Sequence, residues 1–387
     1  MIWIIVGSTI PSMLVCWAAA WAVRRWGPRW GLIDRPGARK VHSTPMPTSG
    51  GLAIWLGVVG PFAAGQVALW VVLAAGGDDA AGLGWLPEVI RVNLAGVAQQ
   101  SLRLWVLLGG GTVLMVLGLV DDRWGLGWRV RIGVQTLVAA VLVLLGWRLS
   151  LFLNSPILTG TLSVIWIVGL VNSFNMLDNM DGLSAGVAAI AAAMLAAVML
   201  MGPHPEASGP QLFVGGLLLV VVGSLLGFLW HNRPPARLFM GDAGSYLVGY
   251  LLAMCTLSAT FAGGAEVRAH AILAPLCVLA VPLYDTTTVV LIRLRAGRSP
   301  FVGDKSHFSH RLVELGMSKP QAVSTICLST ATCGLGALLL HQVNTAGACI
   351  VLLLVGCILV LVGILETTGR RNRFRQPDPP QSDRRSE

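Results

Sequence analysis

Residues 211–230 read QLFVGGLLLVVVGSLLGFLW, a run of 20 residues without a charged side chain. A helix of this length rises about 1.5 Å per residue and covers the ~30 Å hydrocarbon core of a bilayer. Several other blocks of the chain have a similar length and apolarity. Because lipid offers no partners for backbone polar groups, such blocks predict helices. The sequence therefore predicts an all-α, polytopic integral membrane protein.

The composition of the whole chain agrees with this prediction. Of the 387 residues, 55% are hydrophobic and only 12% are charged, whereas soluble globular proteins carry about 25% charged residues. This composition excludes a soluble enzyme and a disordered protein. The 7 cysteines lie in or beside apolar stretches without metal-ligand spacing, so we interpret them as small packing residues.

The apolar blocks divide the chain into membrane spans. The first block shows neither a charged leader nor a cleavage site, so we interpret it as a retained span. Residues 76–103 contain Asp, Glu, Arg and Pro residues and are predicted to form a loop outside the membrane. We expect one transmembrane domain over residues 1–367 and a disordered basic cytoplasmic tail over residues 368–387. The 11 predicted spans are 2–23, 50–75, 104–120, 132–147, 156–175, 183–201, 211–230, 244–262, 270–292, 321–340 and 346–366.

The basic residues predict the orientation of these spans. Of the 27 Lys and Arg residues, 23 lie in segments that follow odd-numbered spans and 4 lie in the other segments. Because cytoplasmic loops are enriched in Lys and Arg, this asymmetry predicts an outside N-terminus and a cytoplasmic C-terminus. The same distribution accounts for the net charge of +9, and we expect no nucleic-acid partner.

Acidic residues gather at the span ends that are predicted to face the cytoplasm. Asp121 and Asp122 follow the third span, and Asp242 precedes the eighth. Ionisable groups at this depth are costly and tend to mark functional sites. The adjacent pair is either a solvated helix end or a site for a divalent cation or cationic side chains, because a helix C-terminus disfavours negative charge. Asp242 is either the N-cap of a helix or a hard oxygen ligand of the kind that suits Mg²⁺.

A ridge of polar side chains ends the fifth span. Asn172, Asn175, Asp178 and Asp181 recur at a spacing of three, which places them along one slowly turning face of a helix. Gly182 then permits a break before the next helix. Packing alone explains such a ridge poorly, so it indicates a functional site.

Two loops on the same predicted side contain basic residues and histidines. The loop after the ninth span contains several arginines together with His307, His310 and Arg311. The arginines obey the topology rule, but a cluster of such donors also suits an anionic group such as a pyrophosphate. This loop lacks the further His or Cys residues that a zinc site needs. In the loop before the second span, Lys40 and His42 are either ligand contacts or ordinary surface residues.

Asp285 differs from these residues because it lies inside the ninth predicted span. It is either a buried structural carboxylate or a residue that supports the site from behind. Carboxylates near the bilayer midplane, on broken helices in paired repeats, would indicate a transporter. The other polar clusters lie at span ends on one side, and the two halves of the chain show no convincing repeat, so a transport function is disfavoured.

Together these segments resemble the polyprenyl-phosphate N-acetylhexosamine-1-phosphate transferase superfamily. The form NMLDNMDGL is more similar to its GlcNAc-1-phosphate branch than to its muramoyl-pentapeptide branch. The family's histidine loop usually reads His-x-His-His-Arg, whereas Ser309 takes the middle histidine position here. The matching pieces follow the family order: DRPGARKVHSTPMPTSGG (34–51), LVDDRWGL (119–126), NSFNMLDNMDGLSAG (172–186), HNRPPARLFMGDAGS (231–245), and RAGRSPF with DKSHFSHRL (295–312).

The resemblance implies a reaction at the cytoplasmic face of the cell inner membrane. The enzyme would transfer an N-acetylhexosamine 1-phosphate, with GlcNAc favoured, from a UDP-sugar to undecaprenyl phosphate and release UMP. This step begins the synthesis of cell-envelope polysaccharides. The alternative within the superfamily is the phospho-MurNAc-pentapeptide transferase of peptidoglycan synthesis. The family requires Mg²⁺ or Mn²⁺, and its members are often dimers, so the resemblance also implies a divalent cation and, by analogy, a homodimer.

The resemblance also implies roles for the polar residues. Asp242 and Asp178 would hold the metal, and Asp121 would orient or deprotonate the lipid phosphate. Because a phosphate monoester has its second pKa at about 6, no strong base is needed at neutral pH. A two-step route through an aspartyl phosphate stays open. By this resemblance the catalytic residues would be Asp121, Asp122, Asp178 and Asp181, and the substrate-binding residues would be Asn175, Asn232, His307, His310, Arg311, Lys40 and His42.

Overall fold

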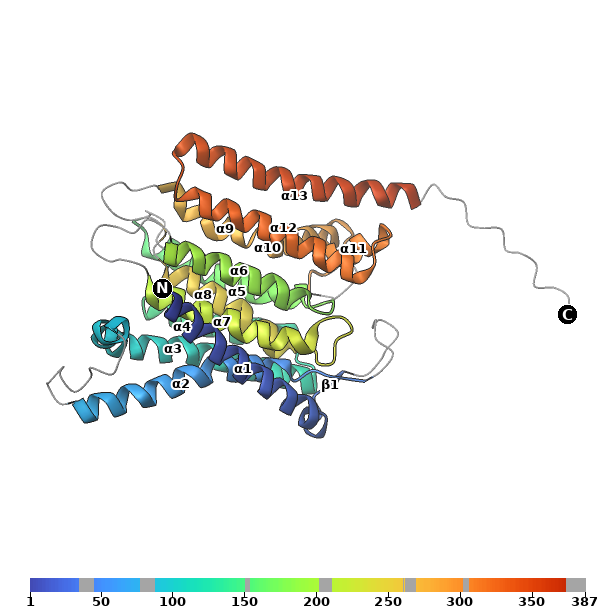
Figure 1. Cartoon of the computed structure of the whole chain (residues 1–387). Coiled ribbons are helices and arrows are strands. Elements are labelled where there is room, and N and C mark those ends of the chain that lie inside the picture. Colours follow the sequence, from blue (N-terminus) through green and yellow to red (C-terminus); the bar gives the residue numbers. More distant parts are fainter. Residues whose placement is uncertain are drawn as a thin grey trace.

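The computed structural model describes residues 1–34, 45–76, 88–149, 154–201, 211–259, 261, 269–301 and 306–373. Over these residues the regular structure is almost entirely helical, which confirms the predicted all-α membrane protein. In this part of the chain 8 helices are long and apolar enough to cross a membrane, or 9 if one bent pair counts as a single span. The helices lie side by side in one bundle (Figure 1).

The helices follow the predicted spans. Each predicted span is helical over most of its length, but α4 and α8 are not among the helices that are long and apolar enough to cross a membrane. The count of 11 spans and their orientation therefore stay predictions. The helices are α1 (Ile2–Trp26), α2 (Gly50–Gly76), α3 (Glu88–Trp124), α4 (Trp128–Leu144), α5 (Pro156–Leu177), α6 (Leu183–Met201), α7 (Leu212–Asn232), α8 (Gly241–Ser258), α9 (Ala274–Val278), α10 (Ala280–Arg295), α11 (Phe308–Glu314), α12 (Lys319–Leu340) and α13 (Thr345–Arg373).

Three segments differ from the prediction. Helix α3 begins at Glu88, so residues 88–103 continue the helix instead of forming a loop, because no proline interrupts this stretch. Helix α13 continues to Arg373, into the segment that was expected to be a disordered tail. The ninth predicted span is broken, and the segment Ala269–Val278 meets α10 at a 66° bend.

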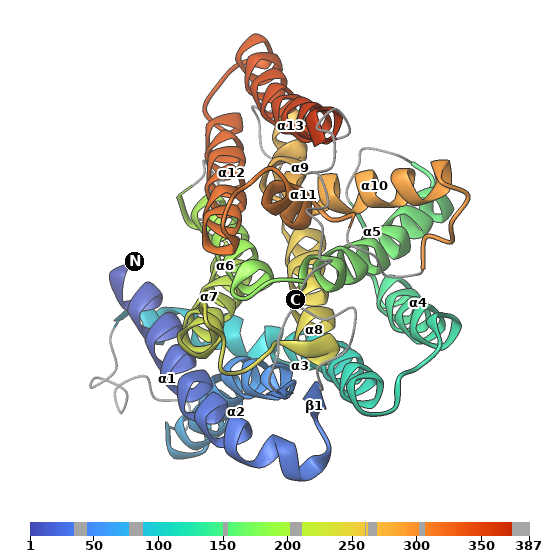
Figure 2. The same ribbon diagram turned by 90° about the vertical axis from the view of Figure 1, so that its right-hand side faces the viewer.

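Helix α8 is the central helix of the bundle. Seen end-on, it is surrounded by the other helices (Figure 2), and it packs against α2, α3, α5, α6 and α7. Every residue from Ala243 to Leu257 is buried. A side chain at Gly51 of α2 would collide with the backbone of Gly244, and one at Gly118 of α3 would collide with that of Ala243. These glycines let α2 and α3 hold the first turn of α8 tightly.

A short antiparallel ribbon lies at the same end of the bundle as the start of α8 (Figure 2). It consists of β1 (Ile33–Asp34) and β2 (Met46–Pro47). Beyond β2, the Phe239 N–H donates to the Pro47 carbonyl oxygen (2.9 Å), and the Gly50 N–H donates to the Phe239 carbonyl oxygen (3.0 Å). These bonds fasten the loop before α8 to the start of α2.

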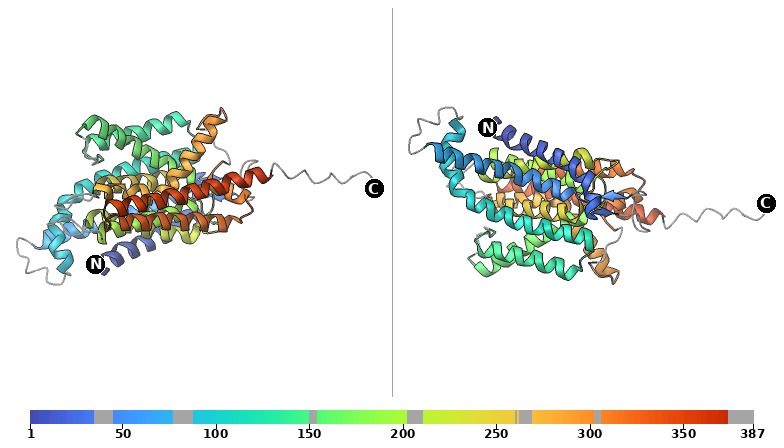
Figure 3. Two further views of the ribbon diagram at one scale, coloured as in Figure 1. Left: turned by 90° about the horizontal axis from the view of Figure 1, so that it is seen from above. Right: turned by 90° about the horizontal axis from the view of Figure 1, so that it is seen from below.

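The polar span ends meet at this end of the bundle. Helix α11, strand β1 and the loop between α7 and α8 lie on the right in Figure 1. The views from above and below show the long helices running side by side toward the same end (Figure 3). Asp121 lies near the end of α3, Asp178 caps the end of α5, and Asp242 lies in the first turn of α8. The fold therefore brings residues that are distant in sequence to one end.

Candidate active site

Asp242 is the centre of a group of polar side chains from α4, α5 and α8. Its Oδ1 accepts a hydrogen bond from Asn175 Nδ2 (2.6 Å), and its Oδ2 lies 3.9 Å from Arg131 Nη1. Asn175 Nδ2 also donates to Ser245 Oγ (3.1 Å). Both oxygens of Asp242 therefore face polar or cationic groups, although α4 and α5, which supply these groups, are distant from α8 in sequence.

Asp121 joins this group from α3 and is buried. Its Oδ2 accepts hydrogen bonds from the Tyr246 hydroxyl (2.9 Å) and from Arg131 Nη1 (3.0 Å). Its Oδ1 accepts one from the Leu126 N–H (2.7 Å). Arg131 therefore lies between Asp121 and Asp242 and interacts with both carboxylates.

Asp122 holds the first turn of α8 in place. Its Oδ1 accepts a hydrogen bond from the Asp242 backbone N–H (3.0 Å), and its Oδ2 accepts one from the Ala243 N–H (3.3 Å). The N-cap position of α8, Met240, contributes no capping side chain, so a carboxylate of α3 serves the free N–H groups and complements the helix dipole. The predicted N-cap alternative for Asp242 is thus wrong, because Asp122 caps the helix and Asp242 lies inside it.

The turn between α5 and α6 adds two further carboxylates. Burial and the negative charge of Asp242 raise the pKa of Asp178 to about 7, although a hydrogen bond from the Gly241 N–H opposes this shift. Asp181 Oδ2 accepts a hydrogen bond from the Ala236 N–H (3.0 Å), which ties the turn to the loop before α8. A raised carboxyl pKa beside other carboxylates indicates negative charge that the protein does not fully balance. We call Asp121, Asp122, Asp178 and Asp242 the carboxylate cluster.

Asn232 is buried at the end of α7 and has a positioning role in the structure. Its Oδ1 accepts a hydrogen bond from the Gly182 N–H (2.9 Å), and its Nδ2 donates to the Leu238 carbonyl oxygen (2.9 Å). The amide therefore joins the α5–α6 turn to the loop before α8. The role of Asn232 in substrate binding, which the resemblance implied, stays a prediction.

The chemistry of the carboxylate cluster fits Mg²⁺. This ion takes oxygen ligands and is usually held by one or two carboxylates together with substrate phosphates. Asp242 and Asp178 supply two carboxylates whose charges interact, and Arg131 is the cation between Asp242 and Asp121. Within the described ranges, no three His, Cys, Asp or Glu side chains form a ready-made metal cage. Substrate phosphates and water would supply the remaining ligands.

The predicted histidine loop forms a second group of polar residues, on α10 and α11. Asp285 is buried, and its Oδ2 lies 3.0 Å from His307 Nδ1. Its Oδ1 accepts a hydrogen bond from the Phe308 N–H (2.6 Å). With Nδ1 facing the carboxylate, the Nε2 of His307 points away from Asp285. Asp285 therefore supports His307 from behind, which was one of its two predicted alternatives.

Arg311 is directed into the helix bundle. Its Nη2 donates to Thr288 Oγ1 (3.1 Å), and its Nε lies 3.1 Å from Glu366 Oε2. The Arg311 and Glu366 side chains are only 3% and 6% exposed, respectively, and the Tyr284 hydroxyl donates to the same Glu366 oxygen (3.1 Å). This geometry supports a role for Arg311 in holding α11 against α13, and it does not support the predicted pyrophosphate contact. We call Asp285, His307, Arg311 and Glu366 the histidine network.

Ser309 connects the histidine network to the carboxylate cluster. Its Oγ donates to Asn179 Oδ1 (2.5 Å), and Asn179 follows Asp178 in the α5–α6 turn. The serine that replaces a family histidine thus ties α11 to the cluster. His310 is half-buried beside His307, with ring centroids 6.4 Å apart.

Lys40 and His42 lie outside the described residues. Sequence reasoning missed Arg131, which it used only to assign topology, and it also missed Tyr246 and Ser245. The available signal was the spacing of Tyr246, four residues after Asp242 on one helix face.

The chain is similar to known proteins over nearly its whole length. It is 32% identical to a probable undecaprenyl-phosphate N-acetylglucosaminyl 1-phosphate transferase of Bacillus subtilis (strain 168), over 96% of this chain and 94% of that protein. It is also 32% identical to the decaprenyl-phosphate N-acetylglucosaminephosphotransferase of Mycobacterium tuberculosis (strain ATCC 25618 / H37Rv), over 97% of this chain and 91% of that protein. Identity to the undecaprenyl-phosphate alpha-N-acetylglucosaminyl 1-phosphate transferase of Escherichia coli (strain K12) is 26%, over 78% of this chain and 74% of that protein.

A family model agrees with these similarities. The model of glycosyl transferase family 4 matches residues 104–260, the segment that contains every member of the carboxylate cluster. The resemblance that the sequence motifs indicated is therefore confirmed. With this match and with relatives of 32% identity along almost the entire chain, the protein belongs to glycosyl transferase family 4, the superfamily of polyprenyl-phosphate sugar-phosphate transferases.

Proposed function

We propose that the protein transfers N-acetylglucosamine 1-phosphate from UDP-N-acetylglucosamine to undecaprenyl phosphate, with release of UMP, at the cytoplasmic face of the inner membrane. The observation that carries this proposal is the meeting of Asp121 and Asp242 at Arg131, with Asp178 close enough to Asp242 for their charges to interact, at one end of a membrane bundle. The names of the relatives support the choice of sugar and lipid. A lipid phosphate and a water-soluble nucleotide can both reach such an interface.

The proposed reaction requires placement and charge neutralisation more than covalent chemistry by the protein. An oxygen of the lipid phosphate attacks the phosphorus that carries the sugar. The bond from this phosphorus to the bridging oxygen breaks, and UMP leaves with that oxygen. Undecaprenyl phosphate is largely dianionic at neutral pH, since its second pKa is about 6. The attack therefore needs no strong protein base.

The carboxylate cluster would bring these anions together. Asp242 and Asp178 would hold Mg²⁺, or Mn²⁺ in its place, which when bound neutralises charge on the phosphate oxygens. Arg131 holds a fixed positive charge beside Asp242. Asp121 already accepts three hydrogen bonds, from Arg131, Tyr246 and Leu126. We therefore assign Asp121 to the orientation of Arg131 and of the lipid phosphate.

The histidine network would contribute the contacts to the nucleotide sugar. Asp285 fixes the ring of His307 so that its Nε2 faces away from the carboxylate. We assign His307 and His310 to the phosphates of the donor. Ser309 keeps both histidines close to the cluster through its bond to Asn179.

A donor panel tests the proposed function. The purified full chain is incubated with undecaprenyl phosphate and with UDP-GlcNAc, UDP-GalNAc or UDP-MurNAc-pentapeptide, with Mg²⁺ present or chelated, and UMP release is measured. We expect release from UDP-GlcNAc alone, and only with Mg²⁺. Release from UDP-MurNAc-pentapeptide alone would establish the peptidoglycan alternative, and no release from any donor would refute transferase activity.

Steady-state kinetics of the same reaction distinguish the two chemical routes. Direct transfer between the bound substrates predicts sequential kinetics, whereas an aspartyl-phosphate intermediate predicts ping-pong kinetics. We expect sequential kinetics, because the nucleophile in the proposed reaction is the lipid phosphate itself.

A further inference from the structure

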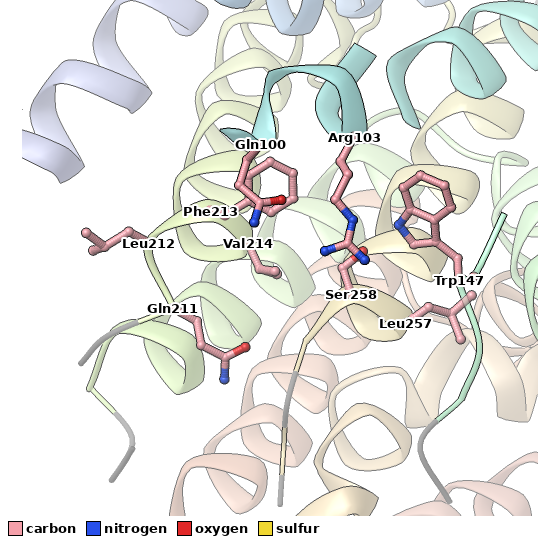
Figure 4. A pocket seen from close by; sticks show the side chains of 10 residues that line it. Gln100, Arg103, Trp147, Gln211, Leu212, Phe213, Val214, Leu257 and Ser258 are labelled. Carbon is pink, nitrogen blue, oxygen red and sulfur yellow. The ribbon is translucent and has the colours of Figure 1, made fainter. Parts of the chain in front are cut away.

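A cavity of about 290 Å³ lies far from the carboxylate cluster, and Figure 4 shows the side chains that line it. On α3, Arg103 of the cavity precedes Asp121 by 18 residues, and on α8, Ser258 of the cavity follows Asp242 by 16 residues. At about 1.5 Å per residue, these separations place the cavity roughly 24–27 Å from the cluster, close to the ~30 Å thickness of the hydrocarbon core. The cavity therefore lies near the opposite membrane surface.

Arg103 is the cationic side chain of this cavity. Its guanidinium carbon lies 5.9 Å from the centroid of the Trp147 ring. Figure 4 shows the guanidinium beside Trp147 and directed toward Ser258. Among the ion pairs formed by the described part of the chain, none involves Arg103. The arginine is thus oriented by an aromatic ring while its charge stays available to an anion.

Ser258 supplies an unpartnered hydroxyl at the same place. Its Oγ is buried and forms no hydrogen bond, although the residue lines the cavity. Buried polar groups in proteins are normally satisfied. A buried hydroxyl next to a guanidinium without a carboxylate partner therefore favours a ligand with several acceptor oxygens.

The other lining residues indicate that such a ligand would lie partly in an apolar environment. Phe213, Val214 and Leu257 line the cavity with apolar surface. Arg and Trp side chains are common where the bilayer meets water, because their apolar parts contact lipid and their polar ends reach the headgroups. A cavity of this size can accept a headgroup while the acyl chains stay in the bilayer.

We propose that this cavity binds the headgroup of an anionic phospholipid, with its phosphodiester on Arg103 and Ser258. A guanidinium can donate two parallel hydrogen bonds to phosphate oxygens. The apolar wall then faces the glycerol and the first methylenes of the lipid. This site is separate from the carboxylate cluster and does not depend on the proposed transferase activity.

Native mass spectrometry of the purified full chain tests this proposal. The protein is titrated with phosphatidylglycerol, phosphatidylcholine or glycerol 1-phosphate. We expect a saturable phosphatidylglycerol adduct that Arg103→Gln weakens roughly tenfold or more, the factor that corresponds to a lost charge-assisted hydrogen bond. Ser258→Ala should weaken it less. Arg91→Gln is the matched control, because Arg91 is an exposed arginine on the same helix that does not line the cavity.

Three results would overturn the proposal. These are unchanged phosphatidylglycerol binding by Arg103→Gln, equal binding of phosphatidylcholine, and binding of glycerol 1-phosphate as tight as that of the lipid. Thermal unfolding without lipid checks that Arg103→Gln is folded. If it is not, Arg103→Lys replaces it, and this variant should still prefer phosphatidylglycerol over phosphatidylcholine, with weaker binding than the wild type. Loss of that preference in the folded lysine variant would contradict a site that depends on positive charge, and unchanged affinity would contradict a role for the planar guanidinium.

Discussion

The carboxylate cluster and the histidine network differ in how their charges are balanced. In the cluster, Arg131 is the cation that the described structure places among the carboxylates, between Asp121 and Asp242. In the network each carboxylate has its own partner, since Asp285 contacts His307 and Glu366 contacts Arg311. Both groups lie at the same end of the bundle and are joined by Ser309 and Asn179.

We interpret this difference as one between the proposed reaction centre and the residues that support it. A buried pair that is balanced and hydrogen-bonded contributes to one defined arrangement of the chain. A group with excess negative charge is stabilised by a cation or a proton from outside, and such perturbed groups are frequent at functional sites. We therefore expect substitutions in the cluster to remove activity, and substitutions in the network to affect stability or the orientation of the histidines.

The largest expected effect follows from Asp242→Asn. The amide is isosteric and can still accept the hydrogen bond of Asn175, but it is a poor metal ligand. We expect turnover to fall roughly a thousandfold, with no change in thermal unfolding. UMP release measures turnover, and Glu314→Gln, at an exposed carboxylate on α11, is the control. Near-normal turnover of Asp242→Asn would remove the metal assignment.

The next effect concerns stability and follows from Glu366→Leu. This change leaves the buried charge of Arg311 without its partner, which costs about 3–5 kcal/mol of unfolding free energy. The double variant Arg311→Met/Glu366→Leu removes both charges and should regain most of this loss. Thermal unfolding in detergent measures both variants. Because Met and Leu roughly conserve the volume of the two side chains, the surrounding packing should persist. We therefore expect the double variant to keep turnover within about tenfold of the wild type. A stable double variant without activity would mean that Arg311 contacts the substrate.

A smaller effect is expected for Asp285→Asn, which changes the hydrogen bond that orients His307. Substitutions of such orienting partners typically lower activity 10- to roughly 100-fold. The specificity constant kcat/KM for UDP-GlcNAc measures this effect, and the variant should still bind the metal. Wild-type kcat/KM would show that the orientation of His307 is unimportant.

The smallest effect separates two tyrosines of α8. Tyr246 donates to Asp121 (2.9 Å), whereas Tyr250, one turn further along, donates to the Leu107 carbonyl oxygen (2.8 Å). Each Tyr→Phe change should cost about 1 kcal/mol of stability, the contribution of one hydrogen bond. Only Tyr246→Phe should also lower turnover, because it loosens Asp121. Equal turnover of Tyr246→Phe and Tyr250→Phe would count against a role for Asp121 in orienting the substrate or Arg131.

Much of the fold and the position of the cluster could be predicted from the sequence. Apolar length predicts helices, and carboxylates at the ends of apolar runs stand out because burial makes them costly. Asp121, Asp178 and Asp242 were recognised in this way. The extension of α3 to Glu88 was missed, because polar residues in 88–103 were interpreted as a loop although no proline breaks the helix there.

The contacts between helices could not be predicted from one sequence. Arg131 obeys the topology rule, so nothing local distinguishes it from other basic residues near the membrane surface. Asp122 caps a helix that begins 119 residues later. Arg311 was assigned to a phosphate because its partner, Glu366, is 55 residues away and on another helix. Each of these roles depends on which helices are neighbours.

The central claim is that the carboxylate cluster takes a divalent cation, whereas the histidine network does not. Binding of Mn²⁺ to the purified protein in the presence of UDP-GlcNAc, followed by electron paramagnetic resonance, tests it most directly. We predict that the wild type and Asp285→Asn bind a single Mn²⁺ ion with similar affinity, and that Asp242→Asn binds it at least about tenfold more weakly. Unchanged Mn²⁺ affinity in Asp242→Asn, or loss of binding in Asp285→Asn alone, would contradict the claim.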